Sequence, residues 1–357
     1  MHLTVHPYDL PLRNPFRIAH ESRTVQPTLI VRLTEGEHYG LGEAPMTRYY
    51  GLDAATCMRQ LKNLSPALPA QGIKALQEQG VAGIMRRIDE YAPALSPFLR
   101  CALDVALHDL WAKLHGKRLG LLWAQDRSRR IPTCYTIGLA PLDEMVRKLR
   151  AKPWPVYKIK LGGGGDDIAI IRELRRHTEA PFYVDANTGW TARQTIDYSG
   201  PLQELGVVFI EQPLKPEDTT GQAEVHRHAL LPVLADESCQ TEADVERCAE
   251  GFAGINIKVV KCGGLLPARR MIVRARALGL RVMAGCMTES SVGISAIAQL
   301  LPELDYADLD GAMLLAEDPA TGVTFDPRTG YAEYPDRLGT GAVLNLPLQT
   351  SPTGADF

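Results

Sequence analysis

The sequence predicts a TIM-type α/β barrel that is preceded by a smaller α+β domain. The first observation is a series of short apolar runs between residues 132 and 309 that alternate with segments of helical periodicity. The second is that ionisable residues end several of these runs at near-even intervals, at positions 160, 185, 211, 236 and 258. Strand ends converge on one face of such a barrel, so this spacing predicts a site there.

Eight runs qualify as barrel strands. They are residues 132–137, 156–160, 182–185, 207–210, 233–235, 254–257, 281–284 and 306–309. The intervening segments carry apolar residues at i, i+3 and i+4, as amphipathic helices do. No long helical segment follows the eighth run, so we expect a modified barrel of the (β/α)7β type.

The first 116 residues lack this alternation and predict a separate capping domain. Strand patterns at 2–10, 27–36 and 39–45 come first, with polar loops expected at 14–26 and 45–54. Helical patterns follow at 55–64, 72–91 and 97–116, the last ending at Gly116, a typical helix C-cap. We expect a capping domain over residues 1–125, a barrel over 126–324, and a tail, 325–357, that packs back on the capping domain.

Composition excludes several classes of protein. The net charge of −3 over 357 residues gives no electrostatic case for binding nucleic acid or an anionic membrane. No apolar run reaches the ~18 residues of a membrane span, and the first residues do not resemble a signal peptide. The seven cysteines form no CxxC pair, which is typical of reduced thiols in a cytoplasmic protein.

Three acids stand at successive strand ends and predict a metal site. Asp185, Glu211 and Asp236 each close a predicted strand. Bare carboxylates on one face repel one another, and a hard divalent cation compensates their charge best. Oxygen ligands with open positions suit Mg²⁺. One such Asp alone would more simply cap the following helix, but three in register favour the metal.

Lysines at other strand ends predict acid/base chemistry. Lys158 and Lys160 lie on the same side of one strand, where each ammonium disfavours the charge of the other. This predicts a lysine with a lowered pKa that can act as a general base. Lys258 lies four units further round and should face Lys160 across the mouth, with Lys261 as its competitor in the loop beyond. Surface lysines with apolar stems are the simpler alternative.

The motifs YKIKLG, YVDANTGW, FIEQP, LADES and NIKVVKCGG, taken together, resemble the muconate-lactonising-enzyme subgroup of the enolase superfamily. The resemblance spans the whole barrel and the capping domain. It implies that the three acids bind one Mg²⁺ per subunit and that Asn187 supports the first of them. It also implies that Lys160 and Lys258 are the two acid/base catalysts, with Lys158 as their electrostatic partner.

The eighth predicted strand separates the reactions within this subgroup. Asp308 and Asp310 lie two residues apart on one side, where two uncompensated carboxylates would bind an ammonium group well. This DxD pattern resembles the element with which dipeptide epimerases hold the N-terminal amine of the substrate. A helix cap or a solvated acid pair is the alternative.

Other substrate contacts are implied by the resemblance alone. The stretch PFRIAHESRTV is similar to a loop of Ala-Glu epimerases in which an Arg at the position of Arg23 binds the glutamate carboxylate. The stretch GCMTESSVG resembles the family's contact with the peptide backbone, through Thr288 and Glu289. In the second loop, Tyr49 is the candidate contact for the N-terminal side chain, with Arg48 and Tyr50 as alternatives.

The expected function is therefore a Mg²⁺-dependent dipeptide epimerase of the cytoplasm. L-Ala-D/L-Glu, or another X-Glu dipeptide, is the expected substrate, in the recycling of cell-wall peptides. o-Succinylbenzoate synthesis, N-acylamino acid racemisation and muconate cycloisomerisation remain alternatives within the subgroup. A non-catalytic ligand-binding barrel is the alternative from another class. Such barrels commonly assemble symmetrically, so a homo-oligomer is compatible with the expected fold.

Overall fold

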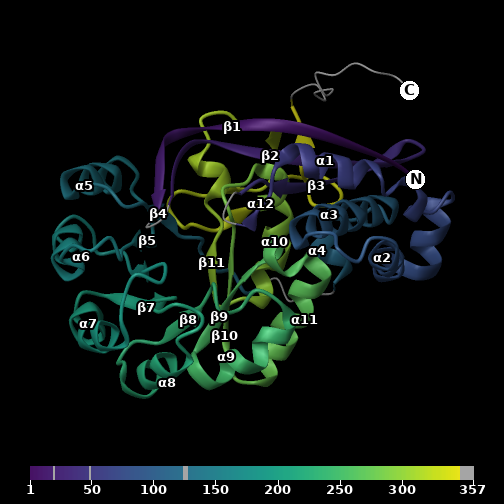
Figure 1. The fold of residues 1–357 in the computed structure, drawn as a ribbon. Coiled ribbons are helices and arrows are strands. Elements are labelled where there is room, and N and C mark those ends of the chain that lie inside the picture. Colours follow the sequence, from purple (N-terminus) through teal and green to yellow (C-terminus); the bar gives the residue numbers. More distant parts are fainter. Residues whose placement is uncertain (19–20, 48–49, 124–127, 346–357) are drawn as a thin grey trace.

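A parallel β-barrel dominates the computed structural model, which describes residues 1–18, 21–47, 50–123 and 128–345 (Figure 1). Within these ranges its eight strands run in the order β11-β10-β9-β8-β7-β6-β5-β4. An isolated parallel bridge between Thr133 and Ala307 joins the two edges. The strands are β4 (Tyr135–Ile137), β5 (Tyr157–Lys160), β6 (Phe182–Asp185), β7 (Val207–Glu211), β8 (Val233–Ala235), β9 (Gly254–Lys258), β10 (Arg281–Gly285) and β11 (Tyr306–Asp308).

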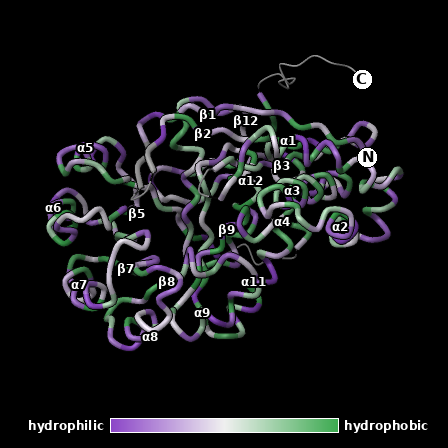
Figure 2. Tube along the Cα trace, in the orientation of Figure 1, coloured by the Kyte–Doolittle hydropathy of each residue, from purple (hydrophilic) through white to green (hydrophobic). Residues whose placement is uncertain are grey.

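Helices cover the outside of the barrel. They are α5 (Leu142–Ala151), α6 (Asp167–Arg175), α7 (Ala192–Glu204), α8 (Thr219–His228), α9 (Val245–Gly251), α10 (Val259–Cys262), α11 (Leu265–Ala277) and α12 (Ser291–Ile297). Hydrophilic and hydrophobic residues alternate along these outer helices (Figure 2). In α6, for example, Ile171 and Leu174 are buried, while the Asp166 side chain caps the helix by accepting from Ala169 N.

The capping part packs a three-stranded antiparallel sheet against helices. The sheet consists of β1 (His2–Ile18), β2 (Glu21–Glu35) and β3 (His38–Pro45), in that order. The helices are α1 (Ala54–Lys62), α2 (Gly72–Tyr91), α3 (Pro97–Leu114) and α4 (Leu119–Leu122). Gly116 follows α3 with a φ of 62°, as expected for a residue that ends a helix. The predicted fold class, a barrel of this type with an N-terminal cap, is confirmed.

One prediction in the cap is wrong. The polar stretch 14–26 is for the most part strand rather than loop, because β1 and β2 continue as a long hairpin beyond their apolar segments. Their register shifts between Pro11 and Phe16, and pairing resumes at Phe16 with Arg23. Backbone hydrogen bonds hold the hairpin without needing an apolar face, so side-chain pattern alone underestimates its length.

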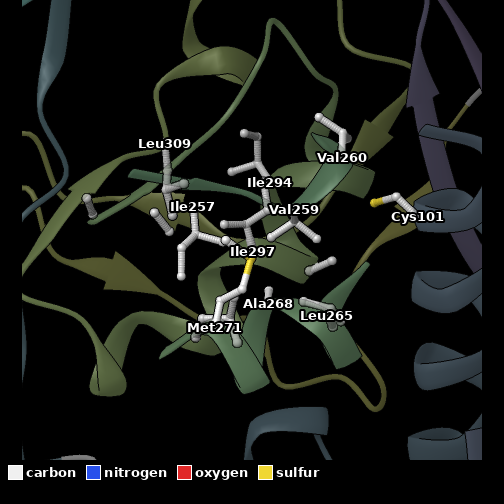
Figure 3. Close-up of a cluster of buried hydrophobic side chains, with 14 of the residues drawn as sticks. Cys101, Ile257, Val259, Val260, Leu265, Ala268, Met271, Ile294, Ile297 and Leu309 are labelled. Carbon is white, nitrogen blue, oxygen red and sulfur yellow. The ribbon is translucent and has the colours of Figure 1, made fainter. Parts of the chain in front are cut away.

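Helix α3 lies between the cap sheet and the barrel. Glycines on β3 allow the contact, since a Cβ at Gly42 would clash with the carbonyl of Ala102. On its barrel side, Asp104 of α3 accepts hydrogen bonds from the backbone of Leu265 at the start of α11. Figure 3 shows the apolar cluster there, in which side chains of β9, α10, α11 and α12 gather beside Cys101 of α3.

The C-terminal tail contacts α3 as well. Asp109, which is fully buried, accepts from Thr340 N at 2.7 Å and from Leu41 N at 3.0 Å, and it pairs with Lys113. One buried carboxylate thereby connects the tail with the cap sheet. The division into domains at residues 125 and 324 stays a prediction.

Membrane spans and cysteine thiols are the two remaining features for which the sequence made a prediction. No helix in the described ranges is both long enough and apolar enough to cross a membrane. All seven cysteines are free thiols, five of them buried and two half-buried.

Candidate active site

The carboxyl ends of the barrel strands bring the predicted polar residues together. Parallel register places Lys160 beside Asp185 and Asp185 beside Glu211. Asp236 follows the end of β8, and Lys258 ends β9. A cavity of about 870 Å³ opens there, and Lys158, Lys160, Lys258 and Lys261 are among its lining residues. The three acids are not themselves lining residues: they lie against these lysines, and none is more than 1% exposed.

Each of the three acids faces at least one lysine ammonium. Lys158 Nζ lies 3.0 Å from Asp185, 2.7 Å from Glu211 and 2.8 Å from Asp308. Lys160 Nζ lies 2.6 Å from Asp185. On the other side of the barrel, Asp236 accepts from two lysines at 2.7 Å each. These are Lys258, on Oδ2, and Lys261, on Oδ1.

These ion pairs set the charge states of the site. Burial acts to lower the pKa of Lys158, but the surrounding carboxylates outweigh it and hold that pKa well above its ordinary value. Asp236 has the same effect on the pKa of Lys258. The pKa lowering expected within the Lys158–Lys160 pair is therefore wrong for Lys158. Burial, followed by the charge of Asp185, raises the pKa of Glu211 to about 7.

The donor set formed by the three acids fits a hard cation. Three buried carboxylates supply oxygen ligands, and Glu211 Oε2 makes no hydrogen bond within the described structure although it lies 2.7 Å from Lys158 Nζ. The carboxylates turn towards lysines, and no three His, Cys, Asp or Glu side chains of the described ranges stand together as a formed ligand group. The chemistry of the donors, rather than their present arrangement, is what matches Mg²⁺.

Neighbouring residues support the acids. The backbone N–H of Asn187, rather than its side chain, donates to Asp185 Oδ1 at 2.9 Å. Asn256 donates to Glu211 Oε1 at 2.9 Å. No role was predicted for Asn256 from the sequence. Its position two residues before Lys258 nevertheless places the two side chains on one side of β9. Glu237, which lines the cavity, was also missed because Asp236 beside it accounted for the motif.

The two aspartates at the end of β11 are in different environments. Asp308 is not the uncompensated carboxylate that was expected, because it pairs with Lys158 and accepts from the Cys134 thiol at 3.2 Å. Asp310 accepts from Thr136 N at 2.6 Å. Burial and the charge of Asp308 raise the pKa of Asp310 to about 7. Both line the cavity, but Asp310 is the one that lacks a lysine partner in the described structure.

Residues of the cap also line the cavity. Arg23 lines it and donates to Thr288 Oγ1 at 3.2 Å. Glu289 is not among the lining residues, and its Oε1 accepts from Met287 N. Tyr49 lies outside the described residues. Its neighbour Tyr50 lines the cavity and packs on Phe98 of α3, with ring centroids 5.2 Å apart.

Fold and site together define a capped β/α barrel with a lysine–carboxylate centre at its mouth. The family model "Enolase C-terminal domain-like" matches residues 142–347. The chain belongs to this family.

Relatives that match this chain over nearly its full length indicate which group within the family it resembles. The chain is 47% identical to the L-Ala-D/L-amino acid epimerase of Flavobacterium johnsoniae, covering 96% of this chain and all of the relative. It is 48% identical to a protein of the same name from a Maribacter species, covering 97% and 100%. A dipeptide epimerase from Methylococcus capsulatus, solved with Mg and the dipeptide L-Arg-D-Lys, superposes with a TM-score of 0.85 at 32% identity, covering 96% and 99%. The predicted superfamily and its dipeptide-epimerase group are confirmed.

The substitution Glu289→Gln should remove a pH dependence of stability. Burial, and then the charge of Glu43, raises the pKa of Glu289 from 4.5 to about 8. The folded state therefore binds more protons than the unfolded state in this window, so stability falls as the pH rises through it. As the pH rises, the free energy of unfolding of the variant should increase relative to that of the parent, by at most ~1.4 kcal/mol per pH unit.

Urea unfolding at about pH 5, 6.5 and 8, without divalent cations, measures this slope. Glu224→Gln, at an exposed carboxylate, is the control and should follow the parent. If Glu289→Gln and the parent kept a constant difference across this range, Glu289 would not be the titrating group.

Proposed function

We propose that this protein is a Mg²⁺-dependent dipeptide epimerase that inverts the α-carbon of the C-terminal residue by transfer of a proton between two lysines. The observation that carries the proposal is the placement of Lys160 and Lys258. They end β5 and β9, which lie four strands apart in the eight-stranded sheet, and both line one cavity. A substrate carbon between them presents opposite faces to the two amines.

The three acids would hold the cation. Asp185, Glu211 and Asp236 are the proposed ligands of one Mg²⁺ per subunit, and the cation would stabilise the negative charge of the deprotonated substrate. The lysine that accepts the α-proton must be a neutral amine, released from its aspartate, while the lysine on the opposite face must be an ammonium that can give up a proton. One lysine then removes the α-proton and the other delivers a proton to the opposite face, which inverts the configuration. Lys158 remains the buried ammonium between the carboxylates.

The substrate is proposed to be a dipeptide with a free amine and an acidic second residue. Asp310, buried at the cavity wall without a lysine partner in the described structure, would hold the substrate ammonium with help from Asp308. Arg23, which also lines the cavity, would bind a glutamate carboxylate, which favours L-Ala-D/L-Glu or another X-Glu dipeptide. The relatives named for L-Ala-D/L-amino acid epimerisation are compatible with a wider range of second residues. A cytoplasmic role in the recycling of cell-wall peptides would follow from such a substrate.

The lysine roles predict complementary losses. Lys160→Ala should abolish exchange of the α-hydrogen in D₂O for one epimer of the dipeptide, and Lys258→Ala should abolish it for the other. Both variants should lose epimerisation by at least ~10³-fold, since each turnover needs both groups. Mass spectrometry of each epimer after incubation with Mg²⁺ measures the exchange.

Lys215→Ala, at an exposed lysine of the β7–α8 loop, should keep exchange with both epimers. Retained exchange of both epimers in Lys160→Ala and Lys258→Ala would exclude the two-lysine mechanism. If the parent protein catalysed α-hydrogen exchange in none of the dipeptides tested, the proposal that it is an epimerase would be wrong.

Asp310→Asn tests the ammonium site. The variant should raise KM for dipeptides about 10- to 100-fold, because a charge-assisted hydrogen bond contributes ~1.5–3 kcal/mol. An N-acetylated dipeptide lacks the ammonium, so the parent should use it poorly and Asp310→Asn should use it no worse. Steady-state kinetics with the two substrates decide the matter. Equal discrimination by parent and variant would exclude Asp310 as the ammonium site. A parent that uses both substrates equally well would favour a substrate without an amine, as in the other reactions of the subgroup.

Arg23→Met tests the preference for an acidic second residue. The variant should lower kcat/KM for L-Ala-L-Glu by about 10- to 100-fold, the loss of a charged contact to the substrate. For L-Ala-L-Leu, which has no side-chain carboxylate, the change should stay within about threefold. Parallel assays on both dipeptides make each the control of the other. A uniform loss on both would assign Arg23 a structural role.

A further inference from the structure

Gln212 follows Glu211 directly, and the proposed mechanism assigns it no role. It is fully buried, and its backbone has a φ of 34°, in the left-handed region that residues other than glycine rarely adopt. Such a conformation persists only where the surrounding structure over-determines it, most often at functional sites.

Both ends of the Gln212 amide are fully engaged. Oε1 accepts from Asp236 N at 2.9 Å and from Ser238 N at 3.0 Å. Nε2 donates to Leu214 O and to Ser238 Oγ, at 2.8 Å each. All four hydrogen-bonding positions of the amide thus have protein partners. Three of the four bonds reach the loop after β8, the loop that carries Asp236.

The backbone of Gln212 connects the neighbouring loops as well. Its N–H donates to Leu234 O of β8, and its carbonyl accepts from Thr188 N at 2.8 Å in the loop after β6. Three consecutive strand-end loops, which follow Asp185, Glu211 and Asp236, are therefore hydrogen-bonded through this residue. The left-handed backbone turns the amide across the barrel rim towards β8.

We propose that Gln212 is a positioning residue that fixes Asp236 relative to Glu211, so that the two carboxylates can bind the same cation. The inference rests on the proposed function, because it takes these acids as Mg²⁺ ligands. Gln212 itself carries no charge and is absent from the cavity lining, so it acts only through the backbone of its neighbour. Groups that orient metal ligands in this way commonly change metal affinity 10- to 100-fold when they are removed.

Gln222 offers a matched control. It is also a buried glutamine of this region, and its Nε2 donates to Lys215 O at 3.0 Å and to Ser238 Oγ at 3.3 Å. It makes no hydrogen bond to Asp236 among those of the described structure. Gln222→Leu therefore removes amide hydrogen bonds from the same loop without removing the contact that the proposal depends on.

The experiment measures Mg²⁺ binding to the full chain by calorimetry, together with the unfolding midpoint and without substrate. Gln212→Leu should weaken Mg²⁺ binding at least ~10-fold, whereas Gln222→Leu should stay within about twofold of the parent even where its midpoint falls. Gln212→Glu keeps an oxygen acceptor for Asp236 N and should bind Mg²⁺ no more than about threefold more weakly than the parent. If Gln212→Leu does not fold, Gln212→Asn, one methylene too short to reach Asp236 N, replaces it with the same expected loss.

The outcomes separate the two proposals. Parental Mg²⁺ affinity in a folded Gln212→Leu or Gln212→Asn would overturn the positioning role and leave the proposed function intact. An equal loss in Gln222→Leu would also overturn it, since any damage to the loop would then suffice. A parent protein that binds no Mg²⁺ would overturn the cation in the proposed function, and the positioning role with it.

Discussion

The buried ammonium of Lys158 is the interaction on which the centre of this molecule depends. Its side chain is 1% exposed and lies within 3.0 Å of carboxylates from three strands, β6, β7 and β11. A lone buried charge would be strongly destabilising, and so would the three acids without it. Lysine and acids therefore require one another. Because Asp185 and Glu211 are in register on adjacent strands, the same arrangement keeps their carboxylates together around Lys158, which lines the cavity.

The cap does more than cover the barrel, because two of its residues contact the segment after β10, part of which lines the cavity. Glu43 of β3 is buried and accepts from Ser290 Oγ at 2.6 Å and from Gly293 N at 3.1 Å, both in the segment after β10. The same segment carries Thr288, which accepts from Arg23. Two cap residues thus contact the segment that runs from the end of β10 into α12. The shape of the cavity there depends on the contact between the two parts of the chain.

The barrel and most of the charged residues at its strand ends could be predicted from the sequence, and the reason is geometric. Parallel strands place their carboxyl ends on one face, so acids and lysines at strand ends must meet whatever the loops do. Partners within that set could not be predicted, because Lys158 and Asp308 are 150 residues apart and pair only where the last strand closes on the first. The direction of the lysine pKa shift was wrong for a related reason. Spacing along β5 revealed the second lysine, but not how closely the acids of other strands approach.

Other features could not be predicted from the sequence pattern, or were overlooked in it, for different reasons. The hairpin through 14–26 is held by backbone pairing that polar side chains neither require nor oppose, so its length left no trace in the apolar pattern. Asn256 could have been found, since alternation along β9 places it on the side of Lys258. Gln212 could not, because its role depends on a left-handed backbone that turns its amide to the next loop.

The seam between β4 and β11 has a consequence for how the protein is made. It is closed by the bridge between Thr133 and Ala307 and by the hydrogen bond from Leu309 N to Thr133 Oγ1. Asp308 and Asp310 also accept hydrogen bonds across it, from the Cys134 thiol and from Thr136 N. During synthesis the chain emerges from its N-terminus, so the acids up to residue 236 leave the ribosome well before Asp308. Until that last strand arrives, the barrel is open and Lys158 lacks one of its three carboxylates. A chain interrupted before residue 308 would therefore hold nearly all of the charged centre without a closed cavity around it.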